Sequence, residues 1–192
     1  MVTLLIPLGG RRQRRLGALS ASQTASYAID PTHTFVTFEV NHFGTSTNRG
    51  RFDKKEGTIQ FNRAGRTGRV DITLQTASIN TGVAPFEAHL KRKDFFNSAE
   101  FPTARFVSER LVFNGDKVTE VVGNLALLGK RLPVTLKANL FNCYPSPILK
   151  REVCGGDFET TIDRAQWGMN TYVPAGQRGD VRLLIQVEAV RQ

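Results

Sequence analysis

Short runs in which apolar and polar residues alternate are the feature that most constrains this chain. In the run FVTFEVNH, residues 35–42, Val36, Phe38 and Val40 are apolar and the residues between them are polar. Successive side chains of a β-strand point to opposite faces, so the run predicts a strand with one buried face. That apolar face ends in His42, which raises the question of what an imidazole does there.

Similar runs recur along the rest of the chain. The runs cover residues 35–42, 49–61, 68–76, three segments within 103–141, 156–163 and 180–190. Gly57 interrupts the second run. The separators NGD at 114–116 and GK at 129–130 predict hairpin turns, because Gly and Asn accept positive φ. About eight short strands with such turns predict an antiparallel barrel or sandwich.

Residues 84–102, APFEAHLKRKDFFNSAEFP, depart from the strand pattern. The spacing of Phe86, His89 and Leu90 is helical, and Pro85 suits the first turn of a helix. We therefore expect a short amphipathic helix that covers one opening of a barrel, followed by an aromatic corner and another strand.

Composition and length fit one globular domain. Of the 192 residues, 40% are hydrophobic and 22% are charged, which supports a real core and argues against wholesale disorder. Thirteen residues are Phe, so we expect an interior rich in aromatic rings. No stretch approaches the roughly 18 consecutive apolar residues that a membrane-spanning helix needs.

Residues 1–26 are interpreted as a leader or a disordered segment that precedes a domain of residues 27–192. They hold four arginines, within RRQRR at 11–15, and no acidic residue. Their apolar run comes before the arginines, which is the wrong order for a secretory signal, although ASQTAS at 21–26 resembles a cleavage region. A start site placed too far upstream, a degenerate signal and an organelle-type leader are the alternatives.

The net charge of +9 is unevenly distributed, because that short leader alone contributes +4. Without its four arginines, 22 basic residues stand against 17 acidic ones. RRQRR alone is compatible with a nucleic-acid or anionic-lipid patch. The remaining sequence has neither a basic stripe with exposed aromatic residues nor a known nucleic-acid-binding motif, so we expect no nucleic-acid partner.

Cys143 and Cys154 flank a segment of ten residues that contains two prolines. An even number of cysteines at hairpin-like spacing is compatible with a disulfide and an oxidising compartment. A pair of reduced thiols is the alternative. The spacing does not match that of zinc ligands, and we expect no metal site.

No catalytic or nucleotide-binding motif stands out, because the HExxH, GxSxG, CxxC, Walker and GxGxxG patterns are all absent from the sequence. The histidines are His33, His42 and His89, and the sequence places none of them near a cysteine. A closed barrel of about eight strands either holds a small ligand or is filled by side chains. The amphipathic helix expected at one opening favours a cavity.

Four segments resemble successive signatures of the YceI-like, polyisoprenoid-binding proteins. They are YAIDPTHTFVTFEVNHFG, HLKRKDFFNSAEFPTARFVS, GNLALLGKRLPVTL and DFETTIDRAQWGMN, in the family's order. The resemblance covers residues 27–190. It implies an all-β fold with one or two short helices, built as an eight-stranded antiparallel, lipocalin-like extended β-barrel. It also implies a long apolar channel for a long-chain isoprenoid and a periplasmic or secreted location. NCYPSPILKREVCG resembles a cysteine-bearing branch of that family.

The residues expected to contact this ligand are mostly apolar side chains on inward faces, with polar groups near one end. They are Val36, Phe38, Val40, His42, Phe52, Leu74, Phe86, His89, Leu90, Phe95, Phe96, Phe106, Leu125, Leu127, Leu136, Leu140, Phe158, Trp167, Met169 and Ile185. For His42 and His89, a structural hydrogen bond is the alternative to contact with a head group. Phe95 and Phe96 also suit a core, Trp167 a plug at the barrel end, and Met169 plain packing.

The function expected from these features is non-catalytic binding of a long-chain amphiphilic isoprenoid. A polyprenyl compound or an isoprenoid quinone such as ubiquinone fits, for carriage, storage or scavenging, and we expect no other cofactor. The alternatives are a lipid-modifying enzyme with a histidine general base and a stress-related structural module with a filled barrel. Transient contact with a membrane and edge pairing into a homodimer are both compatible with the sequence.

Overall fold

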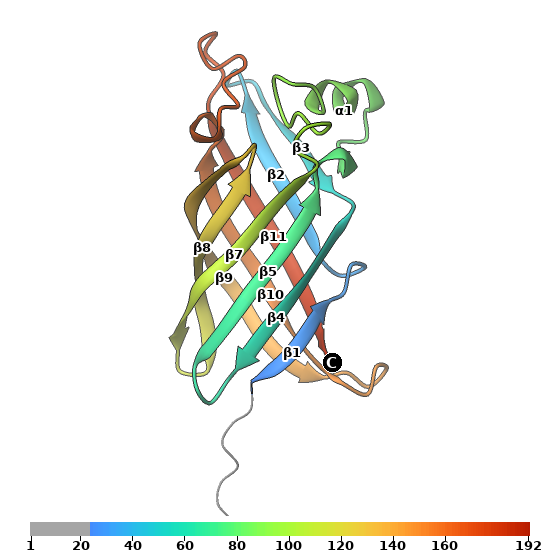
Figure 1. Ribbon diagram of the computed structural model, residues 1–192, viewed down its shortest axis with the longest axis vertical. Helices are drawn as coiled ribbons and strands as arrows, with labels where there is room; N and C mark the ends of the chain where they lie inside the picture. Colours follow the sequence, from blue (N-terminus) through green and yellow to red (C-terminus); the bar gives the residue numbers. More distant parts are fainter. Residues whose placement is uncertain (1–23) are drawn as a thin grey trace, which may run out of the picture.

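The computed structural model describes residues 24–192, and in this range strands dominate (Figure 1). The predicted leader, residues 1–26, lies outside the described residues except for its last three. The helices are α1 (Ala84–Leu90) and the 3-10 helices η1 (Thr76–Ser78) and η2 (Arg164–Trp167). The strands are β1 (Ala25–Ile29), β2 (Phe35–His42), β3 (Ser46–Phe52), β4 (Lys55–Asn62), β5 (Thr67–Gln75), β6 (Ile79–Asn80), β7 (Thr103–Asn114), β8 (Lys117–Leu127), β9 (Lys130–Pro145), β10 (Glu152–Asp163) and β11 (Asp180–Arg191).

A ring of antiparallel strands closes into a barrel. β1, β4, β5, β7, β8, β9, β10 and β11 pair in that order, and β1 also pairs with β11. Tyr27 lies opposite Arg191 at this closing seam. The eight-stranded antiparallel barrel expected from the sequence is therefore confirmed.

The wall of the barrel extends beyond the ring at one end. β2 pairs with the half of β11 that β1 leaves free, with Val40 opposite Val181. β3 pairs with β2, and the two-residue strand β6 pairs with β3. The chain passes from β1 to β2 through Asp30 and Pro31, and the Asp30 carboxylate accepts the Thr32 N–H at 2.8 Å. Because of this corner, β1 and β2 pair with different halves of β11.

The sequence suggested that the run 49–61 is interrupted at Gly57, but the structure places the break between Phe52 and Lys55. β3 ends at Phe52 and β4 begins at Lys55. Between them the Asp53 carboxylate accepts hydrogen bonds from Asn80 and Arg51, at 2.7 and 2.8 Å. Gly57 lies within β4, where a Cβ atom would clash with the Asp71 carbonyl oxygen of β5. The glycine is thus needed for close strand approach and not for a break.

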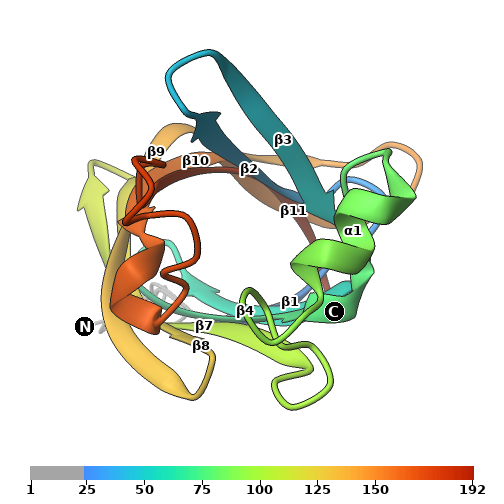
Figure 2. The ribbon, with the colours of Figure 1, turned by 90° about the horizontal axis from the view of Figure 1, so that it is seen from above.

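The expected helix is present as α1, with Pro85 in its first turn. The Glu87 carboxylate accepts the N–H groups of Thr81 and Gly82, at 2.9 and 3.1 Å, and holds the entry to the helix. In the view along the barrel, α1 lies at the rim of the opening, and residues 164–179 lie across the opening from it (Figure 2). No helix within residues 24–192 is long and apolar enough to cross a membrane.

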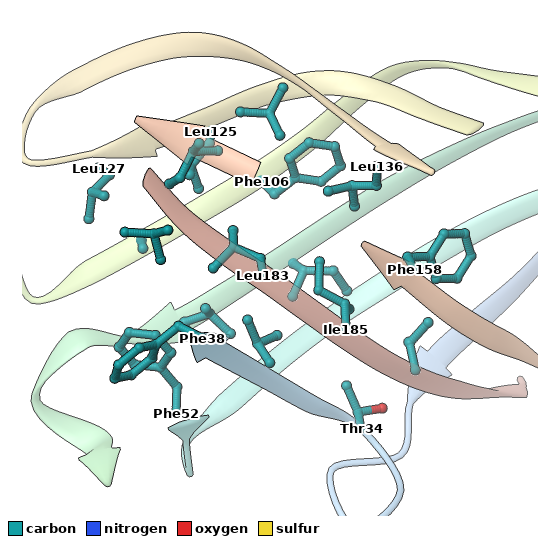
Figure 3. A pocket seen from close by; sticks show the side chains of 18 of the residues that line it. Thr34, Phe38, Phe52, Phe106, Leu125, Leu127, Leu136, Phe158, Leu183 and Ile185 are labelled. Carbon is teal, nitrogen blue, oxygen red and sulfur yellow. The ribbon is translucent and has the colours of Figure 1, made fainter. Parts of the chain in front are cut away.

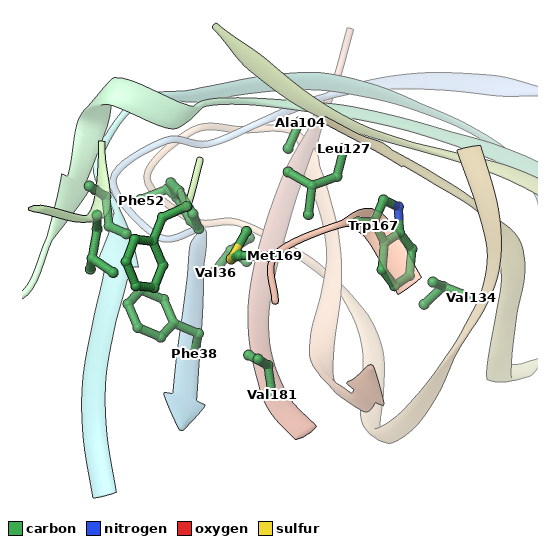
Figure 4. Packing of buried hydrophobic residues seen from close by; sticks show 12 residues of the cluster. Val36, Phe38, Phe52, Ala104, Leu127, Val134, Trp167, Met169 and Val181 are labelled. Carbon is green, nitrogen blue, oxygen red and sulfur yellow. The ribbon is translucent and has the colours of Figure 1, made fainter. Parts of the chain in front are cut away.

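Two apolar clusters lie toward the two ends of the barrel. The α1-end cluster surrounds Phe38, Phe52 and Trp167, and Figure 4 shows its side chains converging from the strands, η2 and the α1 segment. The opposite-end cluster surrounds Tyr27, Phe61 and Phe158. Phe106, Leu136 and Ile185 pack against both clusters and join them along the wall of the barrel.

Candidate functional site

The barrel encloses a cavity of about 480 Å³. Every strand of the ring contributes to its lining, together with β2, β3 and the α1 segment, which comprises α1 and the turn after it to Phe96. In Figure 3 the side chains of Leu125, Leu136, Leu183 and Ile185 point into one space from neighbouring parts of the wall. This arrangement follows from the two-residue period of a strand, which sends every second side chain inward.

All but two of the residues expected to contact a ligand line this cavity; whether they contact one stays a prediction. The lining includes Val36, Phe38, Val40, His42, Phe52, Leu74, Phe86, His89, Leu90, Phe95, Phe96, Phe106, Leu125, Leu127, Leu136, Phe158, Met169 and Ile185. Phe95 and Phe96 pack in the α1-end cluster and also line the cavity. Both interpretations of these two residues, as core and as channel lining, therefore agree with their position.

Leu140 does not line the cavity and is 58% exposed. The alternation from Val134 placed it inward. The register of β9 against β10 shifts between Asp157 and Phe158, because Leu140 pairs with Asp157 whereas Ala138 pairs with Phe158. Such a bulge adds one residue and reverses the faces beyond it, so Leu140 turns outward.

Trp167 is buried at 3% exposure but also does not line the cavity. Its indole N–H donates to the Leu125 carbonyl oxygen at 3.2 Å, which fastens η2 to β8. It belongs to the α1-end cluster with Leu127 and Val134 (Figure 4). Its place agrees with the plug interpretation of this residue and not with ligand contact.

The cavity opens at the α1 end. Three of its lining residues there, His42, Phe43 and Tyr172, are exposed. The His42 ring packs edge-on against Phe43 at 5.1 Å, and the His89 ring packs against Phe95 at 4.7 Å. In residues 24–192, neither imidazole takes part in a hydrogen bond, so the structural hydrogen bonds considered for them are not formed.

Aromatic rings close the opposite end. Phe61 stacks on Phe113 at 6.0 Å and meets Phe141 edge-on at 5.7 Å. Beside them the Tyr27 hydroxyl donates to the Glu152 carboxylate at 2.5 Å. Burial, and then this hydrogen bond, raise the pKa of Tyr27 to about 12. The lining is thus sealed at one end and open at the other.

The expected disulfide joins Cys143 of β9 to Cys154 of β10, which lie directly opposite each other. Of the alternatives left open by the spacing, the pair of reduced thiols is therefore wrong. Cys154 lines the cavity near the sealed end. Within the described residues, no group of three or more His, Cys, Asp or Glu side chains could hold a metal ion.

Arg164 is the functional candidate that the sequence interpretation missed. It lines the cavity and is 4% exposed. Its guanidinium donates to the carbonyl oxygens of Met169 and Thr171, at 2.7 and 2.9 Å, and to the Gln177 side chain at 3.4 Å. Burial lowers the pKa of Arg164 from its ordinary value. An arginine directly after a strand is normally solvated, so no pattern in the sequence marked this one.

Comparison with known proteins decides the family. The model of the YceI-like domain matches residues 27–189, which is nearly the whole described chain. The chain belongs to the YceI-like family. This YceI-like chain is 34% identical over 175 residues to a UPF0312 protein of Pseudomonas aeruginosa, and the match covers 89% of the chain and 90% of that relative.

Solved structures share the fold of this YceI-like chain. BcnA of Burkholderia cenocepacia superposes with a TM-score of 0.69 at 21% identity, over 83% of the chain and 98% of BcnA. A polyisoprenoid binding domain from Saccharophagus degradans, implicated in plant cell wall breakdown, superposes with a TM-score of 0.62 at 16% identity, over 88% of the chain and 99% of that domain. These similarities show that the chain shares its barrel fold with both solved structures.

Proposed function

We propose that this protein binds a long-chain isoprenoid in the barrel cavity and carries, stores or scavenges it. The observation that supports the proposal best is the cavity itself, which every strand of the ring lines with mainly apolar side chains. A filled barrel, the structural alternative, would leave no such space. The Saccharophagus degradans domain of the same fold is described as polyisoprenoid-binding, and this supports an isoprenoid over other apolar chains.

The physical basis is burial of the tail. Removing apolar surface from water is worth roughly 25 cal/mol per Å², and a tail needs no specific polar partner to gain it. Leu136, Leu183 and Phe158 lie along the path from the open end to the sealed end. A polyprenyl compound and an isoprenoid quinone both have such a tail, so the lining alone suits either.

We further propose that the protein acts in an oxidising compartment such as the periplasm, or is secreted. The disulfide between Cys143 and Cys154 supports this location, because such bonds persist outside reducing cytosol. Brief contact of the open end with a membrane would let a tail enter without crossing water. Phe43 and Tyr172, both exposed at that end, suit such contact.

The direct test is native mass spectrometry of freshly purified protein, followed by organic extraction of the bound lipid. Binding of a fluorescent prenyl chain is measured on a separate sample. Leu136 and Leu140 provide a matched pair on β9, since the first lines the cavity and the second faces solvent. Leu136→Trp should displace the lipid and weaken probe binding at least about tenfold. Leu140→Trp should leave both unchanged. Absence of copurified lipid together with absence of probe binding would reject the function.

A further inference from the structure

The charge of the cavity lining is uneven. Arg164 carries the one formal charge among the lining residues within 24–192, and no carboxylate lines the cavity. Polar lining side chains gather at the same open end, where His42, Asn48, His89 and Gln177 lie with Tyr172. The remaining lining is mainly aliphatic and aromatic. The hydroxyl-bearing residues Tyr27 and Thr34 also line the cavity, away from this end. A ligand in the cavity therefore meets a cation at the open end only.

The guanidinium of Arg164 is buried without full compensation. At 4% exposure it forms no ion pair with any carboxylate in the described part of the chain. Its neighbour Asp163 instead accepts the Ala165 N–H at 2.9 Å, although its charge still acts on Arg164. The Arg164 Nε atom is buried and has no hydrogen-bond partner. Buried polar atoms and buried charges are normally paired, so this atom requires an explanation.

The head group of a ligand in the cavity would supply a partner for this atom. Guanidinium donors match carboxylate and phosphate oxygens in geometry, and such charge-assisted bonds are about twice as strong as neutral ones. The carbonyl oxygens of Met169 and Thr171 already engage the other nitrogens and fix the group in place. No carboxylate lines the described cavity. An anionic head group would therefore bind Arg164 without competition from an acidic side chain and without repulsion by one.

We propose that the ligand carries an anionic head group, a phosphate or a carboxylate, which Arg164 binds at the open end while the tail occupies the apolar interior. The proposal deepens the proposed function and rests on it. It selects among long-chain amphiphiles, because it favours prenyl phosphates or carboxylates over neutral quinones and alcohols.

The test compares ligands that share one tail. Farnesyl phosphate, farnesoic acid and farnesol differ only at the head, and their affinities are measured by calorimetry below their aggregation concentrations. The wild-type protein should bind at least one of the two anions at least about tenfold more tightly than farnesol. The anion that binds more tightly shows whether the preferred head group is a phosphate or a carboxylate. This preference should persist at high salt, since buried pairs are screened little.

Variants assign the preference to Arg164. Arg164→Gln should bind the anions and farnesol within about threefold of one another, whereas Arg164→Lys should keep part of the preference. Arg178→Gln is the matched control, because Arg178 pairs with Asp180 at the protein surface and does not line the cavity. It should behave as the wild-type protein does. If Arg164→Gln fails to fold, the wild-type series and Arg164→Lys still decide.

Four results would overturn the proposal. Equal wild-type affinity for all three ligands would reject the anionic head group while leaving tail binding intact. A preference that survives in Arg164→Gln, or that is lost in Arg178→Gln, would assign it to other charges. If none of the three ligands binds, the isoprenoid-binding function fails together with the inference.

Discussion

The ring of Phe141 packs edge-on against the ring of Phe61 at 5.7 Å inside the barrel, although regular alternation along β9 would place Phe141 outside. The bulge after Ala138 exchanges the faces of Leu140 and Phe141. Gly156 of β10 permits it, because a Cβ atom there would clash with the Leu140 carbonyl oxygen.

These neighbouring residues should therefore differ sharply in their effect on stability. Phe141→Ala should lower the free energy of unfolding by about 2–4 kcal/mol, since it removes a ring from the sealed end. Leu140→Ala should change it by less than about 0.5 kcal/mol, since that side chain faces solvent. Urea titrations of both oxidised proteins measure the difference. A larger loss for Leu140→Ala than for Phe141→Ala would contradict the bulge.

Tyr27 should make the protein sensitive to alkali. Its pKa is raised to about 12 in the folded state by burial and by the hydrogen bond to Glu152. A raised pKa contributes stability that is complete below the ordinary value near 10 and is lost as the pH rises through the folded value. The loss between pH ~10 and ~12 should reach about 2 kcal/mol.

Tyr27→Phe isolates this contribution, because phenylalanine keeps the ring and removes the ionisable hydroxyl. The free energy of unfolding of both proteins should be measured from pH ~8 to ~12. The wild-type protein should be the more stable near pH 8, and its advantage should shrink above pH ~10. A constant difference in the free energy of unfolding between the two proteins over this range would contradict the raised pKa of Tyr27.

Asp30 should stabilise the corner between β1 and β2 above acid pH. Hydrogen bonds from Thr32 and then His33 lower the pKa of Asp30 to about 2. A depressed pKa contributes stability that is present above the ordinary value near 3.9 and is lost as the pH falls through the folded value. Asp30→Asn should therefore lower the free energy of unfolding by about 1 kcal/mol at neutral pH, a value that allows for the partial exposure of the carboxylate. Below pH ~2 the substitution should leave the free energy of unfolding unchanged.

His33 reports on the same corner. Its hydrogen bond to Asp30, at 2.8 Å, raises its pKa. Asp30→Asn should lower that pKa toward the ordinary value, which an NMR titration of the His33 ring measures. An unchanged His33 pKa in this variant would mean that the carboxylate and the imidazole do not interact in solution.

The alternation of the sequence predicted much of the site because it depends only on the two-residue period of strands. Leu125, Leu136 and Ile185 line the cavity for that reason. The outward turn of Leu140 was not predictable from this period, since a bulge depends on the register of two strands. Arg164 was missed because its burial depends on a loop, which folds back and offers it carbonyl oxygens from Met169 and Thr171.

The disulfide between Cys143 and Cys154 should contribute to stability without determining the fold. It closes a loop between residues 11 apart in sequence, and a loop of this size is worth about 2–3 kcal/mol through the entropy of the unfolded chain. Replacing both cysteines by serine should lower the free energy of unfolding by that amount, while the far-UV circular dichroism stays that of a β-barrel. Dithiothreitol should destabilise the wild-type protein equally and leave the serine variant unchanged. Two free thiols in denatured protein taken from its native compartment would contradict the bond.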